Sequence, residues 1–204
     1  NLSADIYLPR ASGKFPTMLM RTPYSNNDAG SVEKARSFAN LGYVCVVQDT
    51  RGRWDSDGEH YPFTHDGEDG YDTQEWIGRQ EWSSGKTGMA GASYLGLVQW
   101  QSAPHRSKYL TCMAPRAICG DFYTWLVHPG RALLLNVLMT WGMRTNGRTA
   151  QNIEFHNWTE AFRTLPLIEM DEAAGRDLPF WKDWISHPSY DDYWRPVNVE
   201  EKWA

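Results

Sequence analysis

The sequence predicts an α/β protein in which a mostly parallel sheet is followed by a region made of helices. Short β-rich runs alternate with helical stretches over residues 5–115, which is typical of a parallel sheet. The apolar run 43–47 has no polar alternation, as expected for a central strand covered on both faces. After about Asp121 the strand signal disappears, and Trp, Leu and Arg recur with helical spacing.

The individual elements follow from this pattern. Strands are predicted over residues 5–8, 17–21, 43–48, 87–92 and 110–114. Helices are predicted between them over residues 31–40, 68–80 and 94–103, and later over 131–144, 152–163, 166–174 and 180–186. The Gly- and Asp-rich stretch 51–67 is predicted to be a long loop. We expect residues 1–120 to form the amino-terminal part of the sheet core and residues 121–204 to form a helical insertion.

Composition excludes several classes of protein. The 204 residues include 20 Lys+Arg and 25 Asp+Glu, for a net charge of −5, and 41% are hydrophobic, as in ordinary globular chains. There is no basic stripe, so we expect no nucleic-acid partner. The most apolar stretch, 132–143, is interrupted by Asn136 and Thr140 and is too short to cross a bilayer, so we expect no membrane partner.

The amino terminus bears on the compartment. The first ten residues contain neither the basic start nor the apolar run of a signal peptide, so we expect a cytoplasmic protein. The chain opens directly into a strand-like segment, so we also expect further residues to precede it.

Cofactor signatures are weak throughout the chain. Cys45, Cys112 and Cys119 are too few for a disulfide framework and lack metal spacing; the first two lie in apolar runs and are expected to be buried. The S-G-K-T segment at 84–87 lacks the glycine that a phosphate-binding loop needs at position 80, and no G-x-G-x-x-G follows a strand. One acidic loop could be imagined as a metal site, through Asp55, Asp57, Glu59, His60, His65 and Asp66, but a solvated loop is favoured and we expect no metal or cofactor.

The segment 87–96, T-G-M-A-G-A-S-Y-L-G, is the most informative motif. Small residues lead out of a predicted strand, Ser93 occupies the turn, and a helix-forming run begins at once. Such a bend pushes the serine hydroxyl out of the sheet, and Gly91 and Gly96 leave room for the tight backbone. The following helix points free N–H groups toward any negative charge that develops nearby. Ser93 is therefore a candidate nucleophile; the alternative is a serine that only shapes a turn.

A tyrosine follows another predicted strand in the segment R-T-P-Y at 21–24. Its Pro-fixed turn leaves Tyr24 at the carboxyl edge of the sheet, where ligands of open α/β sheets bind. A phenol at that edge can donate a hydrogen bond to an oxyanion. The alternative is a tyrosine that only packs.

Five segments, taken in order, resemble the CocE/NonD hydrolases, a family that includes cocaine esterase, the α-amino-acid ester hydrolases and the X-Pro dipeptidyl-peptidases. The segments are A-D-I-Y-L-P at 4–9, R-T-P-Y at 21–24, V-Q-D-T-R-G-R at 47–53, G-A-S-Y-L-G at 91–96 and H-P-S-Y-D-D-Y-W at 187–194. They span nearly the whole chain. Family members carry G-x-S-Y-x-G at the nucleophile, which matches the glycine spacing found here.

The resemblance implies an α/β-hydrolase core, incomplete in this chain, with an inserted helical cap. It implies that Ser93 attacks an acyl carbon, that the Tyr24 hydroxyl and the Tyr94 backbone N–H stabilise the oxyanion, and that Trp141 lines the acyl pocket. The expected function is cleavage of small acyl esters or peptide-like amides through an acyl-enzyme, without a cofactor. Two alternatives stay open: an X-Pro dipeptidyl-peptidase of the same fold, and a non-catalytic module that binds a ligand or a partner.

The sequence departs from the family pattern after the nucleophile. A serine needs a histidine to remove its proton and a carboxylate to orient that histidine, and in this fold both follow the serine on later strand-end loops. After Ser93 the sequence offers one strand and then the cap. We therefore expect the acid, the base and the family's β-sandwich domain beyond Ala204, and we expect these 204 residues alone to be inactive and to pair with that missing part or with another copy.

The six histidines offer no clear substitute for the missing base. His60 and His65 lie in the acidic loop, His105 follows the nucleophile helix, His128 and His156 lie in the cap, and His187 belongs to the H-P-S-Y-D-D-Y-W segment. His128 is the best placed of them on the sequence alone, because a cap can overhang the site.

Overall fold

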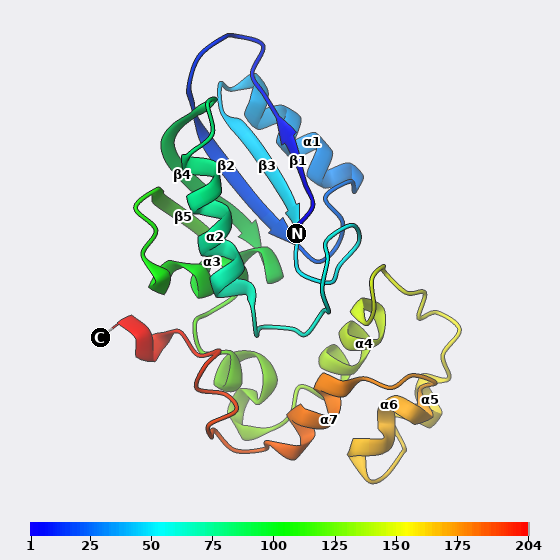
Figure 1. The fold of residues 1–204 in the computed structure, drawn as a ribbon. Coiled ribbons are helices and arrows are strands. Elements are labelled where there is room, and N and C mark those ends of the chain that lie inside the picture. The colour runs from blue at the N-terminus through cyan, green and yellow to red at the C-terminus, as the bar shows by residue number, and fades with distance from the viewer. Residues whose placement is uncertain (204) are drawn as a thin grey trace.

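The structure, a computed structural model that describes residues 1–203, is built on a five-stranded sheet. The strand order is β1-β3-β2-β4-β5, with β1 antiparallel to β3 and the other pairs parallel (Figure 1). The strands are β1 (Ala4–Tyr7), β2 (Phe15–Thr22), β3 (Val44–Asp49), β4 (Ser83–Ala92) and β5 (Leu110–Arg116). The predicted α/β class is confirmed, and each predicted strand has a counterpart.

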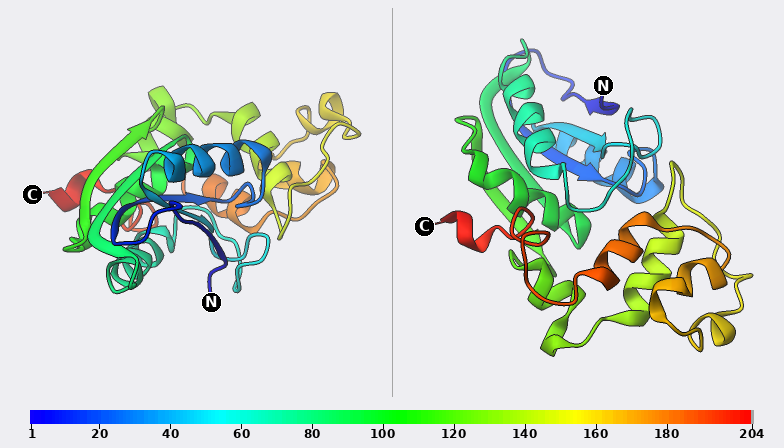
Figure 2. Two further views of the ribbon diagram at one scale, coloured as in Figure 1. Left: turned by 90° about the horizontal axis from the view of Figure 1, so that it is seen from above. Right: turned by 60° about the horizontal axis from the view of Figure 1, so that its bottom comes forward.

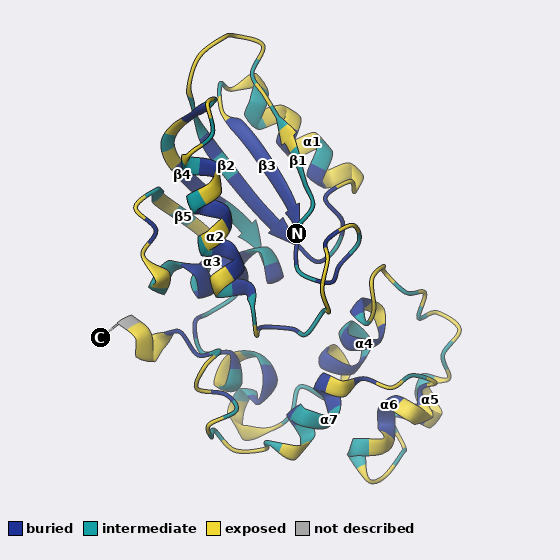
Figure 3. Ribbon diagram, viewed as in Figure 1, coloured by how far each residue is buried: buried dark blue, intermediate teal, exposed yellow. Residues whose placement is uncertain are grey.

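Helices cover both faces of this sheet (Figures 1 and 2). They are α1 (Ala29–Asn40) on one face, and α2 (Asp66–Gly78) and α3 (Tyr94–Ser102) on the other. Successive strand residues point to opposite faces, so Val46 joins the core beside α2 and α3, whereas Cys45 and Val47 join the core beside α1. Strand β3 is consequently buried along its whole length (Figure 3).

The chain after β5 is helical, and we call residues 121–203 the cap. Its main elements are a π-helical turn, η2 (Tyr123–Val127), and the helices α4 (Leu135–Thr145), α5 (Trp158–Ala161), α6 (Met170–Ala173) and α7 (Pro179–Ser186). The cap lies beyond the carboxyl ends of the parallel strands (Figure 1). None of the helices described here combines the length and apolar character that a bilayer crossing needs.

Two cap helices are much shorter than predicted. The prediction over 152–163 is reduced to the single turn α5, which begins where the Asn157 side chain accepts a hydrogen bond from the Glu160 N–H. The prediction over 166–174 is replaced by a 3-10 turn, η4 (Leu167–Glu169), and the short α6. Pro166 precedes that turn in an extended conformation, so no helix continues through it.

Aromatic side chains join the cap to the sheet core. Phe63, from the loop before α2, stacks on Phe122 and Trp184 of the cap with ring centroids 5.6 and 5.7 Å apart. Trp184 is fully buried, as are Trp181 and Trp194, whereas Trp125 of the cap is exposed. The cap and the sheet therefore share one hydrophobic core.

The edge strand β5 corrects one expectation. Cys112 was expected to be buried, but it is exposed, whereas Cys45 in the central strand β3 is buried. Strand β5 pairs only with β4 within residues 1–203, and most of its side chains remain partly or fully exposed. An apolar run in the sequence therefore does not guarantee that a side chain is buried, because a strand with only one neighbouring strand in the described sheet can keep its side chains exposed.

Arg21, near the end of β2, is fully buried and ties the sheet to α2. Its Nε donates to Gln48 Oε1 at 2.8 Å, and its Nη1 donates to the Asp66 carbonyl oxygen at 2.6 Å. Its Nη2 lies 3.7 Å from Asp66 Oδ1 and 3.8 Å from Asp69 Oδ2. The guanidinium charge is thus balanced by two carboxylates inside the protein.

Asp49, the last residue of β3, is a buried carboxylate beside the same edge of the sheet. It is 0% exposed, and its Oδ1 accepts a hydrogen bond from the Asn26 N–H at 2.7 Å. Its Oδ2 is buried without a hydrogen-bond partner in the described structure. Burial raises the pKa of this carboxyl to about 6.

We predict that Arg21→Met lowers the free energy of unfolding by about 3–5 kcal/mol, because it leaves the buried Asp66 carboxylate without its cation. The measurement is urea unfolding of the purified protein. The matched control is Arg79→Met, which breaks an exposed pair with Glu75 and should cost less than about 1 kcal/mol. Equal losses in the two variants would contradict the role of Arg21.

We also predict that Asp49→Asn is stabilising near neutral pH. The folded pKa of about 6 lies above the ordinary value of 3.8. Ionisation of Asp49 therefore lowers the free energy of unfolding progressively as the pH rises from 3.8 to about 6, and the full loss is present above about 6. Asparagine keeps an oxygen for the Asn26 N–H, so the variant should gain about 1–3 kcal/mol at pH 7. The gain should vanish as the pH falls below about 4, and urea unfolding at both pH values checks this. A gain that persists in acid argues against titration of Asp49.

Candidate active site

Ser93 occupies the junction between β4 and α3 in a strained backbone conformation. Its φ is 55° and its ψ is −126°, a region that residues with a side chain rarely adopt and that costs about 1–3 kcal/mol. Its N–H donates to the Arg116 carbonyl oxygen at 3.0 Å, and its own carbonyl oxygen accepts from Gly96 and Leu97 at 2.8 and 2.9 Å. These bonds hold the bend, and the Ser93 side chain is exposed beyond it.

Two glycines make this bend possible. A Cβ on Gly91, where φ is +158°, would lie 2.3 Å from Leu95 Cβ. A Cβ on Gly96 would lie 2.6 Å from Ile118 Cγ2. Strand and helix therefore approach too closely for any side chain at either position, which explains the glycine spacing around Ser93.

Tyr24 lies in the turn that follows β2, and the backbone of this turn is held by Thr22 of β2 and by two residues that follow β3. Its N–H donates to Thr22 Oγ1 at 3.0 Å. The carbonyl oxygen of Pro23, the residue before it, accepts from Arg53 Nε at 2.9 Å and from Trp54 Nε1 at 3.2 Å. The segment that follows β3 thus fixes the turn that carries the phenol.

Tyr94 follows Ser93 and has separate roles for its side chain and its backbone. The side chain is buried, and its hydroxyl donates to Asp66 Oδ2 at 2.6 Å and accepts from the Phe63 N–H at 3.3 Å. The Tyr94 N–H, at the first position of α3, has no acceptor within the described part of the chain. The buried phenol anchors the helix, and the N–H stays free beside Ser93.

Trp141 of α4 brings the cap to both tyrosines. Its indole Nε1 donates to the Tyr24 hydroxyl oxygen at 3.1 Å. Its ring stacks on Tyr94 with centroids 5.9 Å apart, and on Phe63 with centroids 6.3 Å apart. The motif resemblance indicated a pocket-lining role for Trp141, but no sequence signal pointed to its hydrogen bond with Tyr24.

Ser93, Tyr24, Tyr94 and Trp141 line a single cavity of about 110 Å³. Its remaining walls are apolar and come from Phe63, Leu97, Ala117, Ile118, Leu126, Val137 and Leu138. A larger, open hollow of about 720 Å³ lies between β1 and α2, but neither Ser93 nor Tyr24 lines it. The smaller cavity is the candidate active site, because it joins the exposed Ser93 side chain, at a strained strand-to-helix bend, to hydrogen-bond donors.

The structure does not bring His128 to this cavity. Its ring packs 4.8 Å from the Tyr123 ring and 6.2 Å from the Trp194 ring, inside the cap. His60 is the histidine beside the site, with its ring 6.4 Å from Tyr94 and 6.5 Å from Trp141. Sequence reasoning missed it because the loop that carries it folds back over the sheet edge.

His60 is poorly suited to act as a base in this arrangement. Burial, together with the nearby Arg53 charge, lowers its pKa to about 3. No described histidine hydrogen-bonds to Ser93, whose hydroxyl has no partner within residues 1–203. In the same range, no group of three or more His, Cys, Asp or Glu side chains could hold a metal ion.

Comparisons with known proteins show the family of this chain. Residues 1–204 match the family described as X-Pro dipeptidyl-peptidase (S15 family). The chain is 34% identical over 224 residues to cocaine esterase from Rhodococcus sp. (strain MB1 Bresler). That match covers 98% of this chain and 39% of the esterase, so the chain spans well under half the length of this relative.

Solved structures show the same fold. An aminopeptidase from a marine sediment archaeon, Thaumarchaeota archaeon, has a TM-score of 0.81 at 20% identity, over 98% of this chain and 38% of its own. An α-amino acid ester hydrolase has a TM-score of 0.79 at 22% identity, with the same two coverages. A CocE/NonD family hydrolase from Staphylococcus aureus has a TM-score of 0.65 at 22% identity, over 97% of this chain and 35% of its own. The chain therefore belongs to the S15 family of α/β hydrolases, and it corresponds to the amino-terminal part of these proteins.

Proposed function

We propose that the intact protein is a serine hydrolase that cleaves acyl esters or amides through an acyl-enzyme. The observation that carries the proposal is the cavity that Ser93, with its exposed side chain, lines together with Tyr24 and with Tyr94, whose N–H has no acceptor in the described chain. A strained nucleophile at a strand-to-helix bend with two neighbouring donors is the arrangement that acyl transfer needs.

The Tyr24 hydroxyl is prepared to donate rather than to accept. A phenol has one O–H donor and accepts through its oxygen lone pairs. The Trp141 N–H already occupies an acceptor position at 3.1 Å, and it leaves the Tyr24 proton free. A donor on the phenol oxygen also makes its O–H more acidic, so Tyr24 becomes a better partner for a developing oxyanion.

The reaction then follows from these positions. Ser93 Oγ attacks the acyl carbon and its proton passes to a histidine, which we place outside these 204 residues together with the carboxylate that orients it. The carbonyl oxygen becomes the oxyanion and receives hydrogen bonds from Tyr24 and from the Tyr94 N–H. The oxyanion then re-forms the carbonyl and expels the alcohol or amine, which takes the proton from the histidine. The same histidine deprotonates a water that attacks the acyl-Ser93 ester, and it returns the proton to Ser93 Oγ as the acid leaves. The apolar walls of the cavity favour an acyl group without charge.

One alternative keeps specific support, and a second is separated from it by the same experiment. The matched family is described by its X-Pro dipeptidyl-peptidase activity, so the intact protein should be offered both a p-nitrophenyl ester and an Ala-Pro anilide. Faster turnover of the ester assigns an esterase, and faster turnover of the anilide assigns a peptidase. A non-catalytic binding module would react with neither substrate and would not be labelled by a fluorophosphonate.

We predict that Ser93→Ala in the intact protein abolishes turnover of a short-chain aryl ester and labelling by a fluorophosphonate, because both reactions need the Ser93 oxygen. The matched control is Ser37→Ala, which changes an exposed serine on α1 and should leave both unchanged. Turnover that survives in Ser93→Ala would sink the proposed function.

We predict that Tyr24→Phe lowers kcat for the same ester by about 10²–10³-fold, the usual cost of losing one oxyanion donor. Because Ser93 and its bend are untouched, fluorophosphonate should still label the variant to full stoichiometry. Labelling a parallel sample counts the reactive serines, and the initial rate of the unlabelled protein divided by that count gives kcat per site. A kcat close to that of the unaltered protein would remove Tyr24 from the oxyanion site.

A further inference from the structure

Arg53 is a fully buried arginine that bonds only to backbone carbonyls. It is 0% exposed, and its Nε donates to the Pro23 oxygen at 2.9 Å. Its Nη1 donates to the oxygens of Thr145, at 2.5 Å, and Gly147, and lies 3.4 Å from that of Thr149. The Pro23 carbonyl belongs to the sheet core and the other three belong to the cap.

Burying the charged Arg53 side chain costs desolvation free energy. No carboxylate lies within ion-pair distance of Arg53 in the described chain, so its charge is compensated by carbonyl dipoles and by the more distant Asp49 carboxylate. Thr145 ends α4, so its carbonyl lies at the negative end of that helix. Burial lowers the pKa of Arg53 to about 10, which still leaves it charged at neutral pH. An apolar side chain would fill the same space at lower cost, so the hydrogen-bond geometry itself is what Arg53 supplies.

The carbonyls that Arg53 holds flank the partners of one hydrogen bond at the site. Pro23 directly precedes Tyr24, whose hydroxyl accepts from Trp141. Thr145 lies one helical turn after Trp141, and its Oγ1 donates to the Trp141 carbonyl oxygen at 2.8 Å. Arg53 therefore fixes the core side and the cap side of the Tyr24–Trp141 contact at once.

We propose that Arg53 is a positioning residue for oxyanion stabilisation: it clamps the turn before Tyr24 to the end of α4, and so holds the Tyr24 hydroxyl where Ser93 needs it. This inference rests on the proposed hydrolase function. The planar guanidinium suits the task because its donors diverge in a fixed fork, whereas a lysine ammonium is a compact charge without that geometry.

A purely structural role for Arg53 makes a different prediction. Loss of packing or of cap attachment would lower the amount of folded protein or raise KM, whatever residue stands at position 24. Loss of Tyr24 positioning lowers kcat only while Tyr24 is present. A double-mutant cycle between Arg53 and Tyr24 separates the two cases.

The experiment uses the intact protein and a short-chain aryl ester, with kcat expressed per serine labelled by a fluorophosphonate. Arg53→Lys should lower kcat about 10-fold or more, since small displacements at a site are costly, and should change KM less than about twofold. In the Tyr24→Phe background the same replacement should change kcat by less than about twofold. Arg53→Met should give the same changes in kcat and KM as Arg53→Lys. If Arg53→Met does not fold, the test uses Arg53→Lys only.

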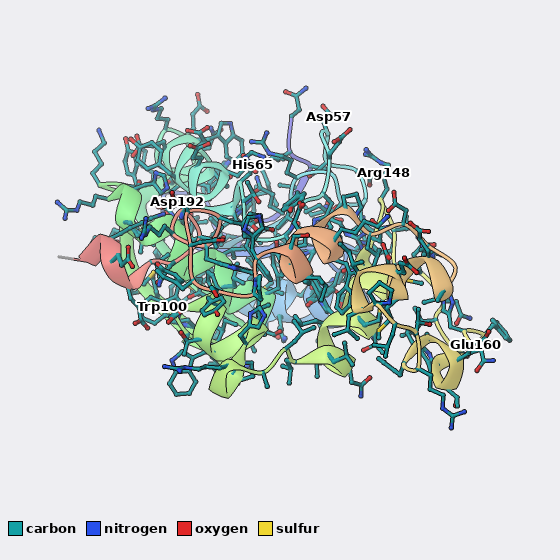
Figure 4. All side chains as sticks on the ribbon, turned by 90° about the horizontal axis from the view of Figure 1, so that it is seen from below. Asp57, His65, Trp100, Arg148, Glu160 and Asp192 are labelled. Atoms are coloured by element: carbon teal, nitrogen blue, oxygen red, sulfur yellow. The ribbon has the colours of Figure 1, made fainter. Side chains whose placement is uncertain are left out.

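The matched control is Arg148→Lys. Arg148 is exposed near the loop that carries Asp57 (Figure 4), and its Nη2 donates to the oxygens of Trp54 and Ser56, each at 2.9 Å. It thus joins the same cap segment to the core through backbone oxygens, and its side chain makes no bond to Pro23 or Tyr24 itself, although the Trp54 indole does bond to Pro23. This variant should keep kcat within about twofold of the unaltered protein.

Three results would overturn the inference: an unchanged kcat in Arg53→Lys, an equal fall in kcat with and without Tyr24, or an equal fall in Arg148→Lys. These results are distinct from failure of the proposed function. If Ser93→Ala retains turnover, or if the unaltered protein takes up no fluorophosphonate, the hydrolase assignment fails and the role of Arg53 falls with it.

Discussion

The positive φ of Ser93 is the constraint on which the site depends. A residue with a side chain adopts this conformation only where its surroundings enforce it, and here a strand, a helix and the Arg116 carbonyl do so together. The same bend exposes the hydroxyl and leaves the Tyr94 N–H without an acceptor in the described chain. One local strain therefore positions both the proposed nucleophile and one of its proposed oxyanion donors.

The second requirement is the contact between the cap and the sheet. Tyr24 belongs to the core and Trp141 to the cap, so the phenol that faces the cavity is oriented by a residue more than one hundred positions away. Two buried polar groups also stabilise this contact: Arg53 donates a hydrogen bond to the Pro23 carbonyl oxygen of the turn, and Asp66 accepts one from the Tyr94 hydroxyl. Aromatic stacking around Phe63 fills the remaining space, so the two parts form one packed unit.

The sequence alone was sufficient to predict those structural features that depend on a local pattern of residues. Strand positions follow from apolar runs, and the bend at Ser93 follows from small residues between a strand and a helix, so both could be predicted. The contacts of Arg53 and His60 could not, because they join segments that meet only in the folded chain. The exposure of Cys112 was mispredicted for a related reason: an apolar run does not show which strand lies at the edge of the sheet formed by residues 1–203.

In the proposed hydrolase, the placement of Trp141 on α4 also limits how the substrate preference can change. Val137 and Leu138, one turn earlier on that helix, form part of the cavity wall. A replacement that enlarges the wall by shifting the helix also moves the indole away from Tyr24. In the proposed hydrolase, substrate selectivity and reaction rate are therefore coupled through helix α4. Only substitutions that leave the axis of α4 in place can change the selectivity without changing the rate.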